Sequence, residues 1–355
     1  MSEQFVGTMP VQEKHRFDSA ALERYLQAHI PDFAGPMEVE QFKGGQSNPT
    51  YKLLTPGRRY VLRRKPPGKL LASAHAVDRE YTVITALAKT DVPVARTWVL
   101  CEDPAIIGTP FYVMDCVEGR VMWDPTVPGA SNAERAAIFD EMNRVMAALH
   151  QVDYAAIGLA DYGKPGNYFA RQIDRWSKQY RASETEKIPS FEKLIEWLPA
   201  NIPPGDETSI VHGDYRLDNM IFHPTEPRVL AVLDWELSTL GHPLADFAYH
   251  CMTWHIPKGV FRGLGGAKLA ELGIPAEADY VKRYCERTGR SGIDPSHWDF
   301  YMAYNLFRLG AILQGIMGRV KDGTAASKQA EMMGRAAGPL ADLGWQQVLK
   351  IQARR

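Results

Sequence analysis

The sequence predicts an α+β protein with two parts, a small N-terminal part built on an antiparallel sheet and a larger part that is mainly helical. Two patterns support this fold class. Short apolar runs separated by Gly and Pro turns fill the first 115 residues, whereas longer segments with apolar residues at helical spacing fill the remainder. The 355 residues, with 45% hydrophobic content, can form a core in each part. We therefore divide the chain into residues 1–115 and 116–355.

The N-terminal part is predicted to contain a five-stranded sheet and two helices. Pro residues and Gly-containing turns separate most of these elements. The predicted strands cover residues 37–42, 50–54, 59–64, 93–101 and 111–115. The predicted helices cover residues 19–29 and 74–89, and each has a stripe of apolar residues at helical spacing. One of these helices is expected to pack against the sheet near the candidate site.

The second part is predicted to be mainly helical, with its polar motifs in loops and small strands. The predicted helices cover residues 133–152, 167–183, 191–198, 276–288, 298–320, 325–337 and 340–352. In the helix over residues 298–320, Asn305, Arg308 and Gln314 lie among apolar residues. Such polar groups are either satisfied core residues or the lining of a pocket. Asn305 and Arg308 are therefore candidate substrate-binding residues.

Composition excludes several classes of protein. A net charge of -1 argues against the broad basic face that nucleic-acid binding needs. The four cysteines lie far apart without a CxxC pair, which predicts no required disulfide and favours a reducing, cytoplasmic setting. No apolar run has the length of a membrane span, and the polar N-terminal residues do not form a secretory signal. We expect no nucleic-acid or membrane partner, and the oligomeric state stays open.

Residues 209–236, SIVHGDYRLDNMIFHPTEPRVLAVLDWE, carry the chemistry-bearing side chains. Two short apolar runs bracket a polar loop, and a third run leads into Asp234, so Asn219 and Asp234 are expected near opposite ends of one hairpin. That arrangement would bring them close to Asp214. The set offers a carboxylate for a proton, and an amide oxygen and a carboxylate for a hard cation such as Mg²⁺. The alternative is a polar hairpin with a buried Asp.

The motifs HGDYRLDN and LDWE resemble the catalytic and metal-binding loops of the aminoglycoside phosphotransferase and choline kinase superfamily. The resemblance implies a bilobal protein-kinase-like fold that uses ATP and Mg²⁺. It implies that Asp214 accepts the proton of a substrate hydroxyl, with Arg216 beside it and near the transferred phosphate or an anionic substrate. Asn219 and Asp234 would hold magnesium, and Glu236 would reach a second ion.

The segment KGGQSNP, between the first two predicted strands, is the candidate phosphate loop. By itself a Gly-Gly pair between strands is an ordinary hairpin turn. Its position in the first hairpin resembles the loop that covers ATP phosphates in this superfamily. The resemblance implies contacts from the backbone of Gly44 and Gly45 and from the side chains of Ser47 and Asn48. The segment departs from the GxGxxG pattern of protein kinases.

The strand over residues 59–64 ends in basic residues. Members of the superfamily use a basic residue here to pair with nucleotide phosphates, and Arg63 matches that position, with Arg64 and Lys65 as alternatives. The other reading is an edge strand kept soluble by its charge. Glu80 lies on the apolar side of the following helix, where a carboxylate is costly unless it meets a cation. Pairing with Arg63 would satisfy both groups, whereas an exposed Glu80 is the alternative.

The segment FYVMDCVEG, residues 111–119, resembles the hinge between the two lobes of these kinases. The resemblance implies that backbone groups of Asp115, Cys116 and Val117 hold the adenine edge and that Met114 lines the pocket. Downstream, Asp246 stands where an Asp usually anchors the backbone of the catalytic loop. His242, His250 and His255 have an irregular spacing that does not match a zinc site.

The resemblance therefore implies a phosphotransferase that acts on a hydroxyl group of a small molecule. The motifs are most similar to a subgroup that includes kinase-like domains of some acyl-CoA dehydrogenases and bacterial hydroxyacyl-CoA kinases, which suggests a hydroxyacyl-CoA acceptor. An aminoglycoside, choline or homoserine kinase is the first alternative, although residues 256–300 lack the acidic cluster that a polycationic acceptor needs. A nucleotide-binding regulator without catalysis is the second. ATP and GTP are not distinguished.

Overall fold

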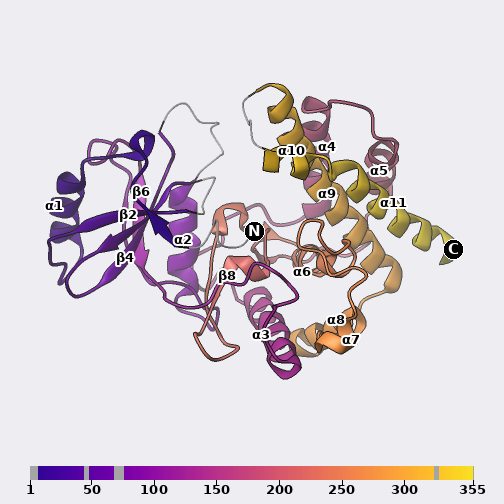
Figure 1. Cartoon of the computed structure of the whole chain (residues 1–355). Coiled ribbons are helices and arrows are strands. Elements are labelled where there is room, and N and C mark those ends of the chain that lie inside the picture. The colour runs from indigo at the N-terminus through magenta and orange to yellow at the C-terminus, as the bar shows by residue number, and fades with distance from the viewer. Residues whose placement is uncertain (1–6, 44–47, 68–75, 324–327, 355) are drawn as a thin grey trace. The chain divides into compact units, whose positions relative to one another are not determined.

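The structure, a computed structural model, describes residues 7–43, 48–67, 76–323 and 328–354. The predicted phosphate-loop residues Gly44, Gly45 and Ser47 lie outside these ranges. The chain forms two compact units, shown in Figure 1. Unit 1 comprises Met1–Trp123, Tyr154–Tyr162 and Asp218–Ser238, and unit 2 comprises Asp124–Asp153, Gly163–Leu217 and Thr239–Arg355. The boundary predicted after residue 115 lies near the end of the first segment of unit 1, and two later segments join that unit.

Unit 1 is built on an antiparallel sheet of six strands in the order β1-β2-β3-β4-β6-β5. The strands are β1 (Thr8–Met9), β2 (Glu38–Phe42), β3 (Thr50–Leu54), β4 (Arg59–Arg64), β5 (Thr97–Cys101) and β6 (Phe111–Asp115). The sequence predicted five strands in this sheet, and the structure adds a sixth, β1. Thr8 and Met9 pair with Phe42 and Gln41, so the polar N-terminal arm adds an edge strand that no hydrophobic pattern marks.

The two faces of this sheet have different neighbours. On one face, Leu22 and Leu26 of α1 (Ser19–His29) form an apolar core with Tyr60 and Leu62 of β4. On the other face lies α2 (Val77–Leu87), which packs against β5 and β6 (Figure 1). Successive side chains of β4 point to opposite faces of the sheet, so Arg63 lies opposite to Tyr60 and Leu62. Arg63 therefore faces α2.

The hairpin that follows the catalytic loop also belongs to unit 1. It runs through η2 (Leu217–Asn219), β8 (Met220–Phe222), β9 (Val229–Val232) and η3 (Trp235–Leu237). β8 and β9 pair antiparallel, with Met220 opposite Val232. The amide of Val232 donates to the carbonyl of Pro93 at 2.9 Å. Pro93 therefore pairs with this hairpin. The strand predicted over residues 93–101 is shorter in the structure, where β5 begins at Thr97.

Unit 2 is mainly helical, as predicted. Its helices are α3 (Asn132–His150), α4 (Tyr168–Ala182), α5 (Pro189–Ala200), α6 (Pro243–Cys251), α7 (Leu269–Leu272), α8 (Glu277–Thr288), α9 (Pro295–Lys321), α10 (Lys328–Gly334) and α11 (Ala337–Arg354). The long helix α9 is central, since it packs against α4, α6, α10 and α11. Strands β7 (Ser209–Val211) and β10 (Thr239–Gly241) pair antiparallel and flank the catalytic loop in sequence.

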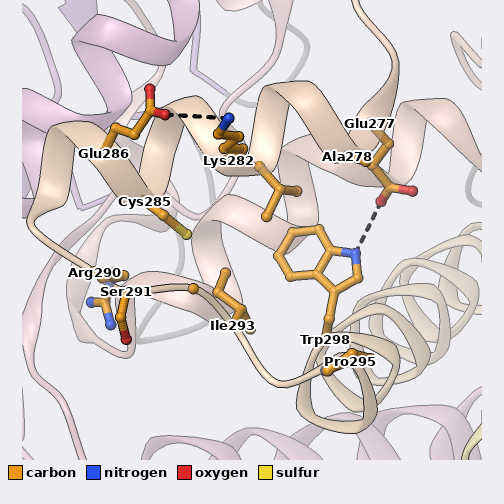
Figure 2. Close-up of a pocket in the computed structure, with 12 residues that line it drawn as sticks. Glu277, Ala278, Lys282, Cys285, Glu286, Arg290, Ser291, Ile293, Pro295 and Trp298 are labelled. Atoms are coloured by element: carbon orange, nitrogen blue, oxygen red, sulfur yellow. Dashed lines mark hydrogen bonds and ion pairs between the residues drawn. The ribbon is translucent and has the colours of Figure 1, made fainter.

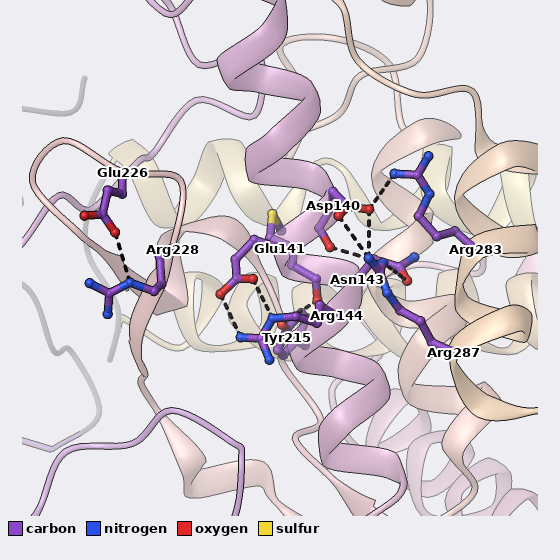
Figure 3. A network of polar contacts seen from close by, with 10 residues as sticks. Asp140, Glu141, Asn143, Arg144, Tyr215, Glu226, Arg228, Arg283 and Arg287 are labelled. Atoms are coloured by element: carbon purple, nitrogen blue, oxygen red, sulfur yellow. Dashed lines mark hydrogen bonds and ion pairs between the residues drawn. The ribbon is translucent and has the colours of Figure 1, made fainter.

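A network of charged side chains joins α3 to α8 within unit 2 (Figure 3). Asp140 accepts hydrogen bonds from Arg283 at 2.5 Å and from Arg287 at 2.9 Å. Arg287 also donates to the amide oxygen of Asn143 at 2.8 Å. Burial works against the charge of Asp140, but the two arginines outweigh it and lower the pKa of that carboxyl. Such a multiply hydrogen-bonded pair orients two helices more firmly than an isolated surface ion pair.

The predictions about disulfides and about membrane spans can be compared with the structure. All four cysteines are free thiols. Among the helices of the described ranges, none combines the length and the apolar character that crossing a bilayer would require.

Candidate active site

The candidate residues fall into two groups, one in each compact unit, and each group is described on its own. Unit 1 holds the residues predicted to contact nucleotide and metal. Unit 2 holds the predicted proton acceptor and the residues that support its loop.

In unit 1, Arg63 is the centre of a buried charge network. Its Nε atom forms an ion pair with Glu80 Oε2 at 2.8 Å, and its Nη2 atom donates to Asp234 Oδ1 at 2.6 Å. A third carboxylate, from Glu236, lies 3.6 Å from Nη2. Burial works against the charge of Arg63, yet Glu80 and Asp234 raise its pKa above the ordinary value. Arg63 therefore links the sheet, α2 and the hairpin of residues 217–237. This hairpin carries the predicted metal ligands and is called the metal hairpin below.

The other two basic candidates point elsewhere. Arg64 is buried on the opposite face, where it donates to the carbonyl of Ile107 at 3.1 Å and lies 5.1 Å from the centre of the Phe17 ring. Lys65 Nζ lies 3.7 Å from Asp78 Oδ1. Of the three residues that the sequence left open, only Arg63 contacts the predicted metal ligands.

Glu80 is 1% exposed and has several hydrogen-bond partners. Besides Arg63, it accepts from the amide of Asn48 at 2.9 Å and from the hydroxyl of Tyr112 at 3.1 Å. Burial raises the pKa of Glu80, and the charge of Arg63 counters part of that rise. The predicted Arg63–Glu80 pair is present. Asn48, which the resemblance assigns to the nucleotide, supports this pair, and Tyr112 joins it without having been singled out in the sequence.

The metal hairpin brings the backbones of the two predicted ligands together. The amide of Leu233 donates to the carbonyl of Asn219 at 2.8 Å. Asp234, which follows, has a φ of 65°, a left-handed conformation that is costly for a residue other than glycine. Asn219, Asp234 and Glu236 offer only hard oxygen donors, the donor set that Mg²⁺ prefers. The residues of this hairpin therefore fit a magnesium site.

The predicted hinge has part of its backbone already engaged within the sheet. The amide of Asp115 donates to the carbonyl of Arg96 at 2.8 Å, and the amide of Cys116 donates to that of Arg59 at 3.2 Å. The carboxylate of Asp115 accepts from the indole of Trp98 at 2.8 Å. Met114 is 9% exposed at the end of β6.

In unit 2, Asp246 holds the backbone of the catalytic loop, as predicted. Its two carboxylate oxygens accept from the amides of His212 at 2.7 Å and Gly213 at 2.8 Å. His150 Nε2 lies 3.3 Å from the same carboxylate. Burial disfavours the charge, but these donors outweigh it and lower the pKa of Asp246. His212 has a structural position, since it is fully buried and its Nδ1 atom accepts from the amide of Asp214 at 3.1 Å.

The side chain of Asp214 contacts Tyr249 and Arg216. The hydroxyl of Tyr249 donates to Oδ1 at 2.5 Å. Arg216 forms an ion pair with Oδ1 through Nε at 2.8 Å and donates to Oδ2 through Nη2, also at 2.8 Å. Arg216 thus lies beside Asp214, as predicted. Tyr249 is an addition, because its position within an apolar helix gave it the appearance of a core residue.

Arg308 and Asn305, predicted as substrate residues, lie within the helical packing. Arg308 is 5% exposed and donates to the carbonyl of Gly213 at 2.7 Å. Asn305 is fully buried, and its amide donates to the carbonyls of Ala245 and Tyr301 at 2.9 Å. Asn305 Oδ1 and Arg308 Nε are nevertheless buried without a hydrogen-bond partner among the described residues, so both alternatives stay open for these two side chains. Gln314 donates to the carbonyl of Ser183 at 2.8 Å.

A second cation lies near Arg216. The guanidinium of Arg216 lies 5.6 Å from the centre of the Phe261 ring, and that of Arg262 lies 5.9 Å from it. Phe261 and Arg262 have φ values of 34° and 57°, so two consecutive non-glycine residues take the left-handed region. Strain of this kind persists only where the surrounding structure imposes it.

A separate surface pocket of about 570 Å³ lies in unit 2 (Figure 2). Its apolar lining includes Ile293 and Trp298, and its charged lining residues have partners, some inside the pocket and some outside it. Lys282 lies 3.9 Å from Glu286, and Glu277 accepts from the indole of Trp298 at 3.1 Å. None of its lining residues belongs to the two candidate groups.

The chain was compared with known families and curated proteins. Residues 38–284 match the phosphotransferase enzyme family. A curated mouse protein, acyl-CoA dehydrogenase family member 10, is 46% identical over 342 residues, which cover 96% of this chain and 32% of the mouse protein. The chain therefore spans about a third of that relative's length.

Solved structures give the same picture. A Ralstonia eutropha structure, assigned provisionally as an aminoglycoside phosphotransferase, is 61% identical, with a TM-score of 0.87 over 94% of this chain and 99% of its own. A choline kinase from Cryptosporidium parvum (12% identity, TM-score 0.65, covering 95% and 97%) shares the fold. So does an aminoglycoside phosphotransferase crystallised with ADP and hygromycin B (13% identity, TM-score 0.59, covering 92% and 98%).

Proposed function

This chain belongs to the phosphotransferase enzyme family, and from that premise we propose that it transfers the terminal phosphate of ATP to a hydroxyl group of a small anionic compound, with a hydroxyacyl-CoA as the favoured acceptor. The observation that carries the acceptor class is Arg216, which forms an ion pair with Asp214 and lies against the same Phe261 ring as a second cation, Arg262.

Unit 1 would bind the nucleotide and its metal. Asn219, Asp234 and Glu236 would hold Mg²⁺, which when bound neutralises phosphate oxygens and orients them for transfer. Arg63 balances the negative charge of Asp234 and Glu236 and stays protonated, so it is suited to contact phosphate oxygens as well. The buried Glu80 holds the guanidinium in place for that contact.

The hinge would bind the adenine edge. The amides of Asp115 and Cys116 donate to carbonyls of the sheet region, which favours Val117 as the residue whose amide meets adenine. Met114 would contact the ring from the end of β6.

Asp214 would accept the proton of the acceptor hydroxyl. As that proton leaves, the hydroxyl oxygen bonds to the terminal phosphorus and the bond from phosphorus to the bridging oxygen of ADP breaks. A carboxylate positioned in this way contributes about 10²–10⁴ in rate. Asp246 supports the arrangement because it holds the amides of His212 and Gly213, and with them the loop that carries Asp214.

The charges near Asp214 favour an anionic acceptor. A cationic sugar placed beside Arg216 and Arg262 would be repelled, at a cost of about 1–4 kcal/mol for each close pair of like charges. The same arginines would attract a carboxylate or the phosphates of CoA through charge-assisted hydrogen bonds.

The names of the curated relatives support a CoA-linked acceptor. The mouse relative is named as an acyl-CoA dehydrogenase, and this chain matches about a third of it. A phosphotransferase part joined to a part that handles acyl-CoA would be expected to share its class of substrate. We also propose a reducing, cytoplasmic setting, which the four free cysteines support.

The test is a side-by-side phosphorylation assay with Mg²⁺-ATP and four acceptors: a kanamycin-like sugar, choline, homoserine and a 4-hydroxyacyl-CoA. We expect kcat/KM for the thioester to exceed that for either cationic acceptor by at least about tenfold, the equivalent of one like-charge contact of 1.4 kcal/mol. Efficient turnover of the sugar with none of the thioester would overturn the acceptor assignment. That outcome would favour aminoglycoside phosphorylation, the alternative to which the assignment of the Ralstonia structure points.

A further inference from the structure

Tyr249 forms a short hydrogen bond with the side chain of Asp214. Its hydroxyl donates to Oδ1 at 2.5 Å, across 35 positions of sequence. The carboxylate is also held by Arg216, which lies on the same loop as Asp214. Tyr249 is therefore the partner that connects the carboxylate to the helical core of unit 2.

The environment of Tyr249 keeps its hydroxyl protonated. The side chain is 5% exposed, and burial together with the negative charge of Asp214 raises the pKa of the phenol far above its ordinary value. A buried hydroxyl needs a partner, and the carboxylate supplies it. Tyr249 is thus a permanent donor to Oδ1.

The position of Tyr249 is itself fixed from two sides. Its ring lies 5.0 Å from the guanidinium of Arg308 on α9, and the same guanidinium donates to the carbonyl of Gly213. Asp246, one turn earlier on α6, accepts from the amides of His212 and Gly213. One short helix therefore holds both the backbone of the catalytic loop and the side chain of its carboxylate.

We propose that Tyr249 is a positioning residue that fixes the rotamer of Asp214, so that the carboxylate is held ready for the acceptor hydroxyl. The inference rests on the proposed role of Asp214 as proton acceptor. Tyr249 donates to Oδ1 from α6, whereas Arg216 contacts both carboxylate oxygens from the same loop as Asp214.

The groups that set the charge at this carboxylate come from three elements. Arg216 and His212 lie on the catalytic loop, Tyr249 on α6 and Arg308 on α9. Replacing Tyr249 by Phe removes one hydroxyl and leaves the ring against Arg308. The variant therefore removes the hydrogen bond to Oδ1 and leaves the charged groups around the carboxylate in place.

The experiment compares Tyr249→Phe with the parent chain in two measurements. In Mg²⁺-ATP turnover, with the best acceptor of the assay above or with water, kcat should fall about 10- to 100-fold while KM for ATP changes less than twofold, as misplacement of a reacting group predicts. In ¹³C NMR of labelled Asp, assigned with Asp214→Asn, the carboxyl resonance of Asp214 should shift in the Phe variant, because the hydroxyl that donates to Oδ1 is gone.

Tyr280→Phe is the matched control. It removes a buried hydroxyl whose hydrogen-bond partner is His250, at 2.8 Å, in place of Asp214. We expect this variant to lose thermal stability but to keep kcat within about twofold and the Asp214 resonance in place. If Tyr249→Phe behaves like the control, the positioning role is wrong. If instead Asp214→Asn retains turnover, the proposed role of Asp214 fails, and the NMR comparison still decides whether Tyr249 acts on that carboxylate.

Discussion

At Arg63, one guanidinium group contacts carboxylates from two different elements, α2 and the metal hairpin. A buried Glu80 would be unstable by itself, and so would a buried Arg63. Each makes the other tolerable, and Asn48 and Tyr112 provide the remaining hydrogen bonds of Glu80. The network therefore has a structural cost if broken, in addition to any contact with nucleotide.

Replacing Arg63 by Ala tests that cost. The change leaves Glu80 buried without its cation, and we expect the free energy of unfolding to fall by about 3–5 kcal/mol. Urea denaturation followed by circular dichroism measures it. Arg59→Ala is the control on the same strand, because its ion pair with Glu118 is exposed and should contribute less than about 1 kcal/mol. Equal losses for the two variants would contradict the buried-network interpretation.

Asp214→Asn tests proton transfer at the same scale. The amide keeps the size of the side chain but cannot accept the proton, so kcat should fall by about 10²–10⁴. Nucleotide affinity should stay within about twofold, since the proposed nucleotide contacts come from other residues, among them Arg63 and Val117. Turnover assays and calorimetric titration with Mg²⁺-ATP measure the two quantities. Near-normal turnover would remove Asp214 from its proposed role.

At the scale of elements, α6 and the metal hairpin each contribute one aspartate with a different proposed role. Asp246 of α6 supports the backbone of a loop, and Asp234 of the hairpin would bind the metal ion. Asp246 satisfies two buried backbone amides, and losing a partner for each costs about 1–3 kcal/mol. Asp246→Ala should therefore lower the midpoint of thermal unfolding strongly and leave Mg²⁺-dependent nucleotide affinity largely unchanged in the folded fraction.

Asp234→Ala should show the opposite pattern. Loss of an oxygen ligand should weaken nucleotide binding in Mg²⁺ and have little effect on binding in EDTA. Calorimetric titration in both buffers, alongside differential scanning calorimetry of both variants, provides the comparison. Unchanged nucleotide affinity in Mg²⁺ for Asp234→Ala would show that the metal ligand is elsewhere.

At the scale of the whole molecule, buried histidines couple stability to pH. Burial lowers the pKa of His242 and of His250 to about 4, against an ordinary value of 6.5. Between these values the unfolded chain binds protons that the folded chain does not. The contribution of these two histidines to the free energy of unfolding should therefore be at its full value above pH 6.5. It should decrease as the pH falls toward 4.

We expect the loss between pH 7.5 and pH 5.5 to be about 1 kcal/mol for each of these histidines. Urea denaturation at the two pH values measures it. His250→Gln should be less stable than the parent at pH 7.5 but should lose less on acidification. A parent chain with the same free energy of unfolding at both pH values would show that these imidazoles titrate normally.

The sequence by itself determined the features that depend on local order along the chain. Strand alternation put Arg63 on the face away from Tyr60 and Leu62, and helical spacing put Glu80 on the buried side of α2. The motif HGDYRLDN and the resemblance predicted a catalytic loop with Asp246 as its anchor, and Asp246 holds the amides of His212 and Gly213. Such features can be predicted because periodicity and motif spacing are properties of neighbouring residues.

Only the tertiary structure decided contacts between distant residues. It selected Arg63 over Arg64 and Lys65, added β1 to the sheet, and turned Asn48, Asn305 and Arg308 toward structural partners. It also gave polar roles to Tyr112 and Tyr249, which in the sequence are indistinguishable from core aromatics. The physical reason is that a tyrosine buries an apolar ring wherever the pattern requires one, whereas the partner of its hydroxyl depends on which distant segment packs against it.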